Sequence, residues 1–148
     1  MNICRVSKED LEELKSVAYD SLFDAVDAPL EEKERLILHI FADIESEVSS
    51  YESIFIKWVD NDIKGYLLLK ERWNLCHLFV RPDDFRRGIG SQLLKFTIED
   101  LKAGENKGYM CLNSSLNAYG FYLKMGFEND STRPPKSDTS VPMIYRIP

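Results

Sequence analysis

The residues best suited to chemistry lie in the stretch VRPDDFRRGIGS, residues 80–91, where two adjacent arginines, Arg86 and Arg87, come directly before Gly88 and Gly90. Helical spacing of apolar residues follows directly after Gly90. The start of a helix presents unpaired backbone N–H groups and the positive end of the helix dipole, and glycine lets a ligand approach the chain closely. Arg86 and Arg87 add charge-assisted hydrogen-bond donors. The stretch therefore predicts a site for a phosphate group, and a pyrophosphate would use both arginines.

The same residues do not match two other phosphate-binding motifs. A Walker loop requires GxxxxGK[ST], which the chain lacks, and the dinucleotide motif GxGxxG fails because residue 93 is leucine. For this segment alone, a tight turn that carries surface arginines is an equal alternative. The rest of the chain has to separate the two.

The elements around the stretch predict an α/β fold in one domain, residues 1–148. Ser7 and Asp10 form a capping box that opens a first helix, and Pro29 opens a second whose apolar stripe runs to Val48. The remaining apolar runs predict strands over residues 2–6, 53–59, 63–70, 73–80, 109–115, 126–130 and 141–147, a helix after Gly90 and a helix over residues 117–125. Strands 73–80 and 109–115, joined by one helix, should lie parallel. Ligand crevices lie at the carboxyl ends of such strands, where the glycine stretch falls.

A second block, NSSLNAYGFYLKMGF at residues 113–127, separates the alternatives. Together with VRPDDFRRGIG it resembles the GNAT superfamily of acyl-CoA-dependent N-acetyltransferases, whose second motif matches Ser115, Ala118, Tyr122, Gly126 and Phe127. A strand containing "PM" follows, as in that family, and the resemblance covers about residues 53–148. It implies a mixed, mostly antiparallel sheet of six to seven strands, flanked by about four helices, with a splayed parallel strand pair.

The resemblance also implies a binding site for acetyl-CoA as co-substrate, without a metal. Backbone groups of residues 78–80 would pair with the pantetheine arm, the 86–91 loop would hold the pyrophosphate, and residues 115–119 would lie on the adenosine side. The residues expected at the cofactor are Leu78, Phe79, Val80, Phe85, Arg86, Arg87, Gly88, Ile89, Gly90, Ser91, Ser115, Asn117, Tyr119 and Tyr122. Tyr122 is the expected catalytic residue, because a phenol can protonate the departing thiolate; its plain alternative is a packing aromatic.

The chain departs from the family pattern in two places. Phe85 stands where Gln or Arg is usual, and Arg86 replaces a common first glycine, so one side-chain contact is lost and another gained. Asn74 and Cys76 occupy the positions of a strand-borne base, and neither is a good base. Strand alternation would put His77 with Leu75 and Phe79, opposite Asn74 and Cys76, so we expect a structural or surface role for it, as for His39. Glu71 is a guess for the acid that receives the amine proton through water.

The distribution of charge along the chain suggests which class of acceptor the protein uses. Residues 1–62 hold 16 acidic and 6 basic residues, residues 63–148 hold 9 and 13, and the net charge is −6, which disfavours nucleic acid as a partner. In the family the acceptor enters over the first two helices and the 131–140 loop, which we expect to be mobile. Candidate walls are Tyr19, Phe23, Asp24 and Asp27, and their acidity favours a cationic amine.

The cysteine count and the hydropathy of the chain indicate the expected cellular compartment. No apolar run is long enough for a membrane span and no signal-peptide core is present, so a cytoplasmic protein without a membrane partner is expected. The odd number of cysteines, Cys4, Cys76 and Cys111, argues for reduced thiols. In the absence of other signals, we expect all three to be small buried side chains.

The sequence therefore predicts an N-acetyltransferase that moves acetyl from acetyl-CoA to a primary amine, of a small molecule or a protein, by direct attack. The alternatives are an acyl-CoA-binding sensor without turnover, which the missing base favours, and an interaction domain that binds no cofactor. The amine, the base, the use of larger acyl groups and assembly as a homodimer are left open.

Overall fold

One seven-stranded sheet organises the computed structural model, which describes residues 2–25 and 28–148. The strand order is β1-β2-β3-β4-β5-β7-β6. The strands are β1 (Ile3–Arg5), β2 (Ile54–Asp60), β3 (Asp62–Lys70), β4 (Asn74–Val80), β5 (Tyr109–Ser115), β6 (Glu128–Asn129) and β7 (Ser140–Arg146). The helices are α1 (Leu11–Ala25), α2 (Leu30–Glu47), α3 (Ile89–Ala103) and α4 (Tyr119–Lys124), with short 3-10 turns η1 (Lys8–Asp10) and η2 (Pro82–Asp84). Neighbouring strands are antiparallel except β4 and β5, so the predicted mixed sheet with one parallel pair is confirmed.

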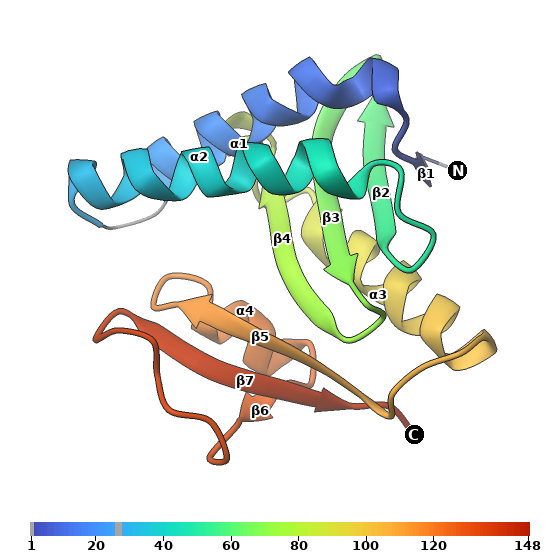
Figure 1. The fold of residues 1–148 in the computed structure, drawn as a ribbon, viewed down its shortest axis with the longest axis vertical. Coiled ribbons are helices and arrows are strands. Elements are labelled where there is room, and N and C mark those ends of the chain that lie inside the picture. The colour runs from blue at the N-terminus through green and yellow to red at the C-terminus, as the bar shows by residue number, and fades with distance from the viewer. Residues whose placement is uncertain (1, 26–27) are drawn as a thin grey trace.

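Helices cover both faces of the sheet (Figure 1). On one face α1 and α2 bury Leu14, Ile44 and Phe55 in a common cluster. On the other face α3 packs Leu93 and Leu94 over the middle strands in a second cluster, to which α4 adds Tyr122. Because strand residues alternate between the two faces, β2 and β3 contribute side chains to both clusters. The sequences of these two strands are therefore nearly continuous apolar runs.

Local sequence signals account for most element boundaries. The Ser7 N–H donates to the Asp10 carboxylate at 2.8 Å, as the capping box predicts. The β2–β3 turn places Asn61 at φ 67°, a left-handed conformation that asparagine tolerates. Helix α4 is shorter than predicted, because a turn capped by Ser115, whose hydroxyl accepts from the Ala118 N–H at 3.3 Å, precedes it.

Two further sequence expectations can be compared with the described residues. No helix within residues 2–25 and 28–148 is both long and apolar enough to cross a bilayer. The three cysteines are free thiols, but the expectation that all are buried is wrong for Cys4, which is exposed on the edge strand β1; Cys76 is half-buried and Cys111 is buried.

Candidate active site

The loop between β4 and α3 has the backbone form that an anion site needs. Arg86 adopts φ 69° and Gly88 φ 76°, and Gly88 is the N-cap residue of α3. The first helical hydrogen bond runs from the Gln92 N–H to the Gly88 carbonyl at 3.0 Å. The N–H groups of the preceding residues in the first turn have no partner within the helix. They lie at the positive end of the dipole, at the carboxyl end of β4.

Both glycines of this loop have room for a Cβ. A Cβ at Gly88 would meet nothing nearer than the Gln92 side-chain nitrogen at 3.9 Å, and one at Gly90 would make an ordinary contact with Phe121 at 3.6 Å. Packing within the protein therefore does not require glycine at Gly90. At Gly65, by contrast, a Cβ would lie 2.9 Å from a backbone oxygen. The bare backbone at Gly88 borders free space, which fits a pyrophosphate group.

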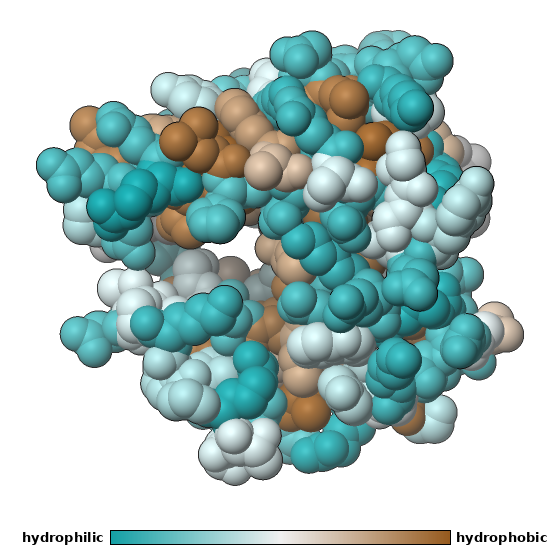
Figure 2. All heavy atoms as spheres, viewed as in Figure 1, coloured by the Kyte–Doolittle hydropathy of each residue, from teal (hydrophilic) through white to brown (hydrophobic). Residues whose placement is uncertain are grey.

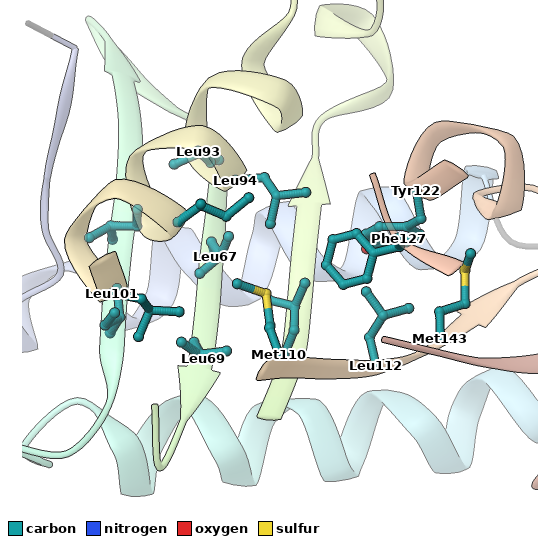
Figure 3. Packing of buried hydrophobic residues seen from close by; sticks show 14 of the residues in the cluster. Leu67, Leu69, Leu93, Leu94, Leu101, Met110, Leu112, Tyr122, Phe127 and Met143 are labelled. Atoms are coloured by element: carbon teal, nitrogen blue, oxygen red, sulfur yellow. The ribbon is translucent and has the colours of Figure 1, made fainter. Parts of the chain in front are cut away.

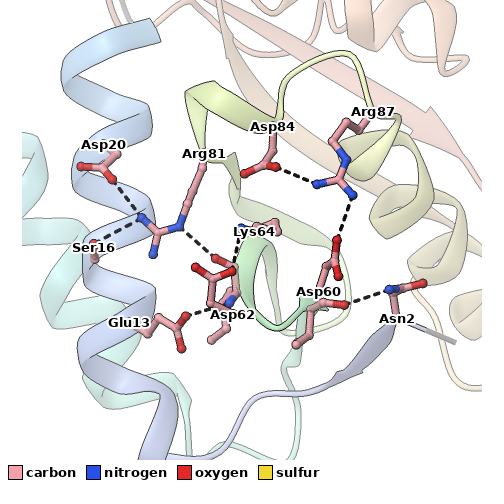
Figure 4. A network of polar contacts seen from close by, with 12 residues as sticks. Asn2, Glu13, Ser16, Asp20, Asp60, Asp62, Lys64, Arg81, Asp84 and Arg87 are labelled. Carbon is pink, nitrogen blue, oxygen red and sulfur yellow. Dashed lines mark hydrogen bonds and ion pairs between the residues drawn. The ribbon is translucent and has the colours of Figure 1, made fainter.

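The two arginines of the loop have different surroundings. Arg87 donates to Asp84 at 2.7 Å and to Asp60 at 3.1 Å (Figure 4). Its guanidinium lies 5.2 Å from the centre of the Trp58 ring. Arg86 is exposed and makes no hydrogen bond or ion pair with any residue in the described ranges. The sequence alone presents the two as equivalent phosphate ligands.

The parallel strands β4 and β5 diverge beyond their first residues (Figure 1). They pair only at Asn74 and Cys111, next to a hydrogen bond of 2.8 Å from the Cys111 N–H to the Trp73 carbonyl. The predicted arm-binding residues 78–80 lie beyond this point, paired with β3 on one side and facing the opening on the other. The splayed pair that the resemblance implied is confirmed.

Tyr122 of α4 is buried next to this opening, with 8% of its surface exposed. Its ring packs edge-on against Phe121 and Phe127 at centroid distances of 5.1 and 5.4 Å, and Figure 3 shows it beside Leu112 of β5. The hydroxyl makes no hydrogen bond within the described part of the chain, where no fully buried side-chain oxygen or nitrogen lacks a partner. The hydroxyl must therefore reach accessible space. Burial raises the pKa of Tyr122 above its ordinary value, so the phenol stays protonated at neutral pH.

The structure brings the two sequence blocks together. The Ser91 hydroxyl lies 3.6 Å from the Met125 sulfur, which places α4 against the first turn of α3. Of the residues expected on the adenosine side, Tyr119 donates its hydroxyl to Asn129 at 2.7 Å, and Asn117 is exposed. Phe85 is 45% exposed, an apolar ring beside the loop. Their roles at a cofactor stay predictions.

The expected alternation along β4 is wrong at Cys76. Leu68 of β3 pairs with His77 and Leu69 pairs with Leu75, so Cys76 is an extra residue without a partner on β3. Such a bulge shifts the side chains that follow it to the other face. Leu75 therefore packs in the cluster under α3, whereas His77 faces α2, and the prediction that they share a face is wrong.

His77 belongs to a buried network that ties α2 to the sheet. Its Nδ1 lies 3.1 Å from the Tyr66 hydroxyl and its Nε2 lies 3.2 Å from Asp43, which also accepts from Lys70 at 2.6 Å. Burial lowers the pKa of His77, so a neutral imidazole donates to Asp43; this bond and Lys70 lower the pKa of Asp43 to about 2. Asn74 pairs with Lys70 and so lies on the same face as His77, not opposite it as predicted.

None of the expected base positions carries a ready base. Burial raises the pKa of the Cys76 thiol to about 11, and both ring nitrogens of His77 are engaged. Glu71 is exposed in the β3–β4 turn, at the end of β4 opposite the glycine loop. Within the described ranges, no three His, Cys, Asp or Glu side chains gather as around a metal ion.

A cleft on the acceptor side separates α1 and α2 from the β5–β7 half of the sheet, and Figure 2 shows the surface hollowed there. Of the predicted walls, Tyr19 is 49% exposed and stacks on Phe23 at 4.4 Å, Asp24 is exposed, and Asp27 lies outside the described residues. The 131–140 loop, predicted to be mobile, is fastened at its start by Arg133.

Arg133 forms a four-point contact. It donates to Asp130 at 2.7 Å, to Asn113 at 3.2 Å, and to the Leu112 and Met143 carbonyls at 3.1 Å each. The contact joins the loop to both β5 and β7. The sequence did not indicate this contact or the partners of Arg87. Of those partners, only Asp84 lies close to Arg87 in the sequence, three residues before it.

Comparisons with known proteins agree with this geometry. The acetyltransferase (GNAT) domain family matches residues 25–145. Among curated proteins, UPF0157 protein YqkA of Bacillus subtilis is 34% identical over 58 residues, which cover 39% of this chain but only 17% of that protein. The chain thus spans a small part of that relative's length.

Solved structures share the whole fold. A GCN5-related N-acetyltransferase from Rhodopseudomonas palustris has a TM-score of 0.83 at 17% identity, covering 97% of this chain and 94% of its own. The PaiA N-acetyltransferase of Thermoplasma acidophilum, in complex with coenzyme A, has a TM-score of 0.76 at 24% identity, covering 97% of both chains. A GNAT acetyltransferase of Staphylococcus aureus has a TM-score of 0.77 at 20% identity, covering 99% of both chains. With the family pattern spanning most of the sequence, the chain belongs to the GNAT acetyltransferase family.

Proposed function

We propose that the protein is an N-acetyltransferase that moves the acetyl group of acetyl-CoA to a primary amine. The observation that carries the proposal is the Tyr122 hydroxyl, which is held by packing next to the diverging strands and makes no hydrogen bond to a described residue. Because this hydroxyl reaches accessible space, it is free to donate to a thioester bound between the two strands. The loop at residues 86–91 would hold the pyrophosphate, and the open edge of β4 at residues 78–80 would pair with the arm.

The reaction is a direct transfer without a covalent enzyme intermediate. The amine nitrogen attacks the thioester carbonyl carbon, so a C–N bond forms and the C–S bond breaks. A backbone N–H at Phe79 or Val80 polarises the carbonyl oxygen. Tyr122 donates its proton to the departing thiolate, and the amine proton leaves through water. Tyr122 recovers its proton from solvent, which its raised pKa favours at neutral pH.

The acceptor we favour is cationic, because the helices above the cleft carry exposed acidic residues such as Asp24. Asp20, also exposed, already pairs with Arg81 at 2.9 Å. A panel of polyamines, aminoglycosides and lysine peptides, read by thiol release, would identify it. The reaction needs the amine in its neutral form, so the rate should rise with pH toward the pKa of the acceptor.

Tyr122→Phe tests the mechanism, because it removes the hydroxyl and keeps the ring. A general acid contributes roughly 10²- to 10⁴-fold, so turnover should fall within that range while acetyl-CoA affinity changes little. The loss should shrink with a thioester whose thiol has a low pKa, since that thiolate departs without a proton. Tyr145→Phe, on β7 next to Phe127, is the matched control. Wild-type turnover of both thioesters by Tyr122→Phe would make the residue a packing aromatic.

A second candidate is an acyl-CoA sensor without turnover. The absence of a ready base at Asn74 and Cys76, with the Cys76 pKa raised to about 11, favours it. Tight binding of acetyl-CoA by calorimetry, with no thiol release for any amine of the panel, would establish the sensor instead.

A further inference from the structure

The two neighbouring arginines of the glycine loop make different contacts. Arg87 reaches across to β2, where it pairs with Asp60 at 3.1 Å and lies 5.2 Å from the centre of the Trp58 ring. Its other amino group contacts Asp84 of η2 at 2.7 Å. Figure 4 shows the guanidinium between these two carboxylates. Arg87 thus joins its own loop to the β2–β3 hairpin.

The same hairpin also contacts the first turn of α3. The Trp58 ring nitrogen donates to the Gln92 side chain at 3.0 Å, one helical turn after Gly88. Trp58 is buried, with 6% of its surface exposed, so its ring is a fixed support for Arg87 and Gln92 alike. The start of α3 and the loop before it therefore share one anchor.

The loop needs such an anchor because the backbone conformation of Arg86 is unfavourable for a residue with a Cβ. Arg86 and Gly88, on either side of Arg87, both adopt left-handed φ values, 69° and 76°. A residue with a Cβ pays about 1 kcal/mol or more for that conformation. Arg86 has no hydrogen bond or ion pair with the described residues that would offset this cost. The contacts of Arg87 oppose relaxation of the loop.

We propose that Arg87 is a positioning residue, which holds the loop so that the first N–H groups of α3 face the pyrophosphate, and that Arg86 alone supplies a charged side chain to it. This inference rests on the proposed binding of acetyl-CoA. It assigns different roles to two arginines that the sequence presents as equivalent.

The alternative is that Arg87 leaves its carboxylates and binds the phosphate. The two cases predict opposite effects of Asp60→Asn. If Arg87 holds the loop through Asp60, the variant binds acetyl-CoA more weakly. If Arg87 is a phosphate ligand, loss of the competing carboxylate frees it, and binding becomes tighter. Asp62→Asn is the matched control, since Asp62 lies on the same hairpin with similar exposure but pairs with Lys64.

The experiment measures acetyl-CoA affinity by calorimetry and, without acetyl-CoA, hydrogen exchange of the amides of residues 86–91. Because the Arg87–Asp60 pair is exposed, we expect Asp60→Asn to weaken binding about 2- to 5-fold relative to Asp62→Asn and to speed exchange of the loop. Arg87→Gln should have a larger effect, and adding Asp60→Asn to it should change nothing more. Arg87→Lys, which keeps one ion pair, should fall between wild type and Arg87→Gln.

Arg86→Gln should behave differently. Loss of a charge-assisted bond should weaken acetyl-CoA binding about 10- to 100-fold while loop exchange stays as in wild type. Tighter binding by Asp60→Asn than by Asp62→Asn, or equal binding and exchange of the two, would overturn the inference. A wild type that fails to bind acetyl-CoA, with faster loop exchange in Asp60→Asn alone, would refute the proposed function and leave the anchoring role of Arg87 supported.

Discussion

Gly88 and Gly108 offer a matched pair of positions for testing the phosphate loop. Both adopt left-handed backbone, with φ 76° and 87°, and a Cβ at either would be free of close contacts, with nothing nearer than 3.9 Å at Gly88 and nothing within 4 Å at Gly108. They lie near opposite ends of α3. Glutamate at either position adds the same strain and the same charge, but only Gly88→Glu places them where the pyrophosphate is proposed to bind.

The expected magnitudes follow from these numbers. A side chain in left-handed backbone costs about 1 kcal/mol or more, so each variant should lower the melting temperature by about 2–4 °C. A carboxylate about 5 Å from one unit of phosphate charge adds roughly 3 kcal/mol of repulsion at an effective dielectric constant of about 20. Gly88→Glu should therefore weaken acetyl-CoA at least about 100-fold, and Gly108→Glu should bind as wild type does.

Calorimetry gives the affinities, and thermal unfolding shows whether the two variants are equally strained. Gly90→Glu is a third variant, because the backbone of Gly90 is not left-handed and a Cβ there makes only ordinary contacts. It should lose acetyl-CoA binding with little change in melting temperature. If Gly88→Glu and Gly90→Glu both fold and bind acetyl-CoA like Gly108→Glu, the loop is a turn and the cofactor assignment is wrong.

Two predictions concern the polar networks. Because burial lowers the pKa of His77, the unfolded chain binds its proton more readily; the resulting stability is present above about pH 6.5 and is lost as the pH falls. Urea unfolding between pH 7.5 and 5 should show a decline that His77→Gln removes and that His39→Gln, a change on the exposed face of α2, does not. Arg133→Met should leave Asp130 with its hydrogen bonds from Thr132 but without its cation, lower the melting temperature and open residues 131–139 to proteases; an uncut loop would show that other contacts hold it.

The sequence predicted those parts of the fold that depend on local signals. The capping box at Ser7, the apolar stripes of α1 and α2 and the presence of a helix after the glycines are all set by residues a few positions apart, although α3 begins at Ile89, before Gly90. The two family motifs fixed the chain order of the site, and the parallel crossover followed from one strand–helix–strand passage.

The remaining features depend on pairing between distant segments. The bulge at Cys76 reverses the face of His77, and nothing in the alternation of NLCHLFV marks it. Asp60 and Arg87 are 27 residues apart and meet only through the β2–β3 hairpin. The left-handed backbone at Arg86 agrees with the glycine that the resemblance implied at this position, because the conformation is free of cost only without a Cβ.

The diverging strands also create two sheet edges inside the molecule. Beyond Asn74 and Cys111, one side of β4 and one side of β5 carry backbone groups that no neighbouring strand pairs. Exposed edges of this kind are templates for strands of other chains. A bound pantetheine arm would fill the gap as a short surrogate strand, so a ligand that enters it should slow aggregation as well as raise the melting temperature. Storage with coenzyme A would then preserve monodisperse protein longer than storage with the same concentration of pyrophosphate, which occupies the loop but leaves both edges open.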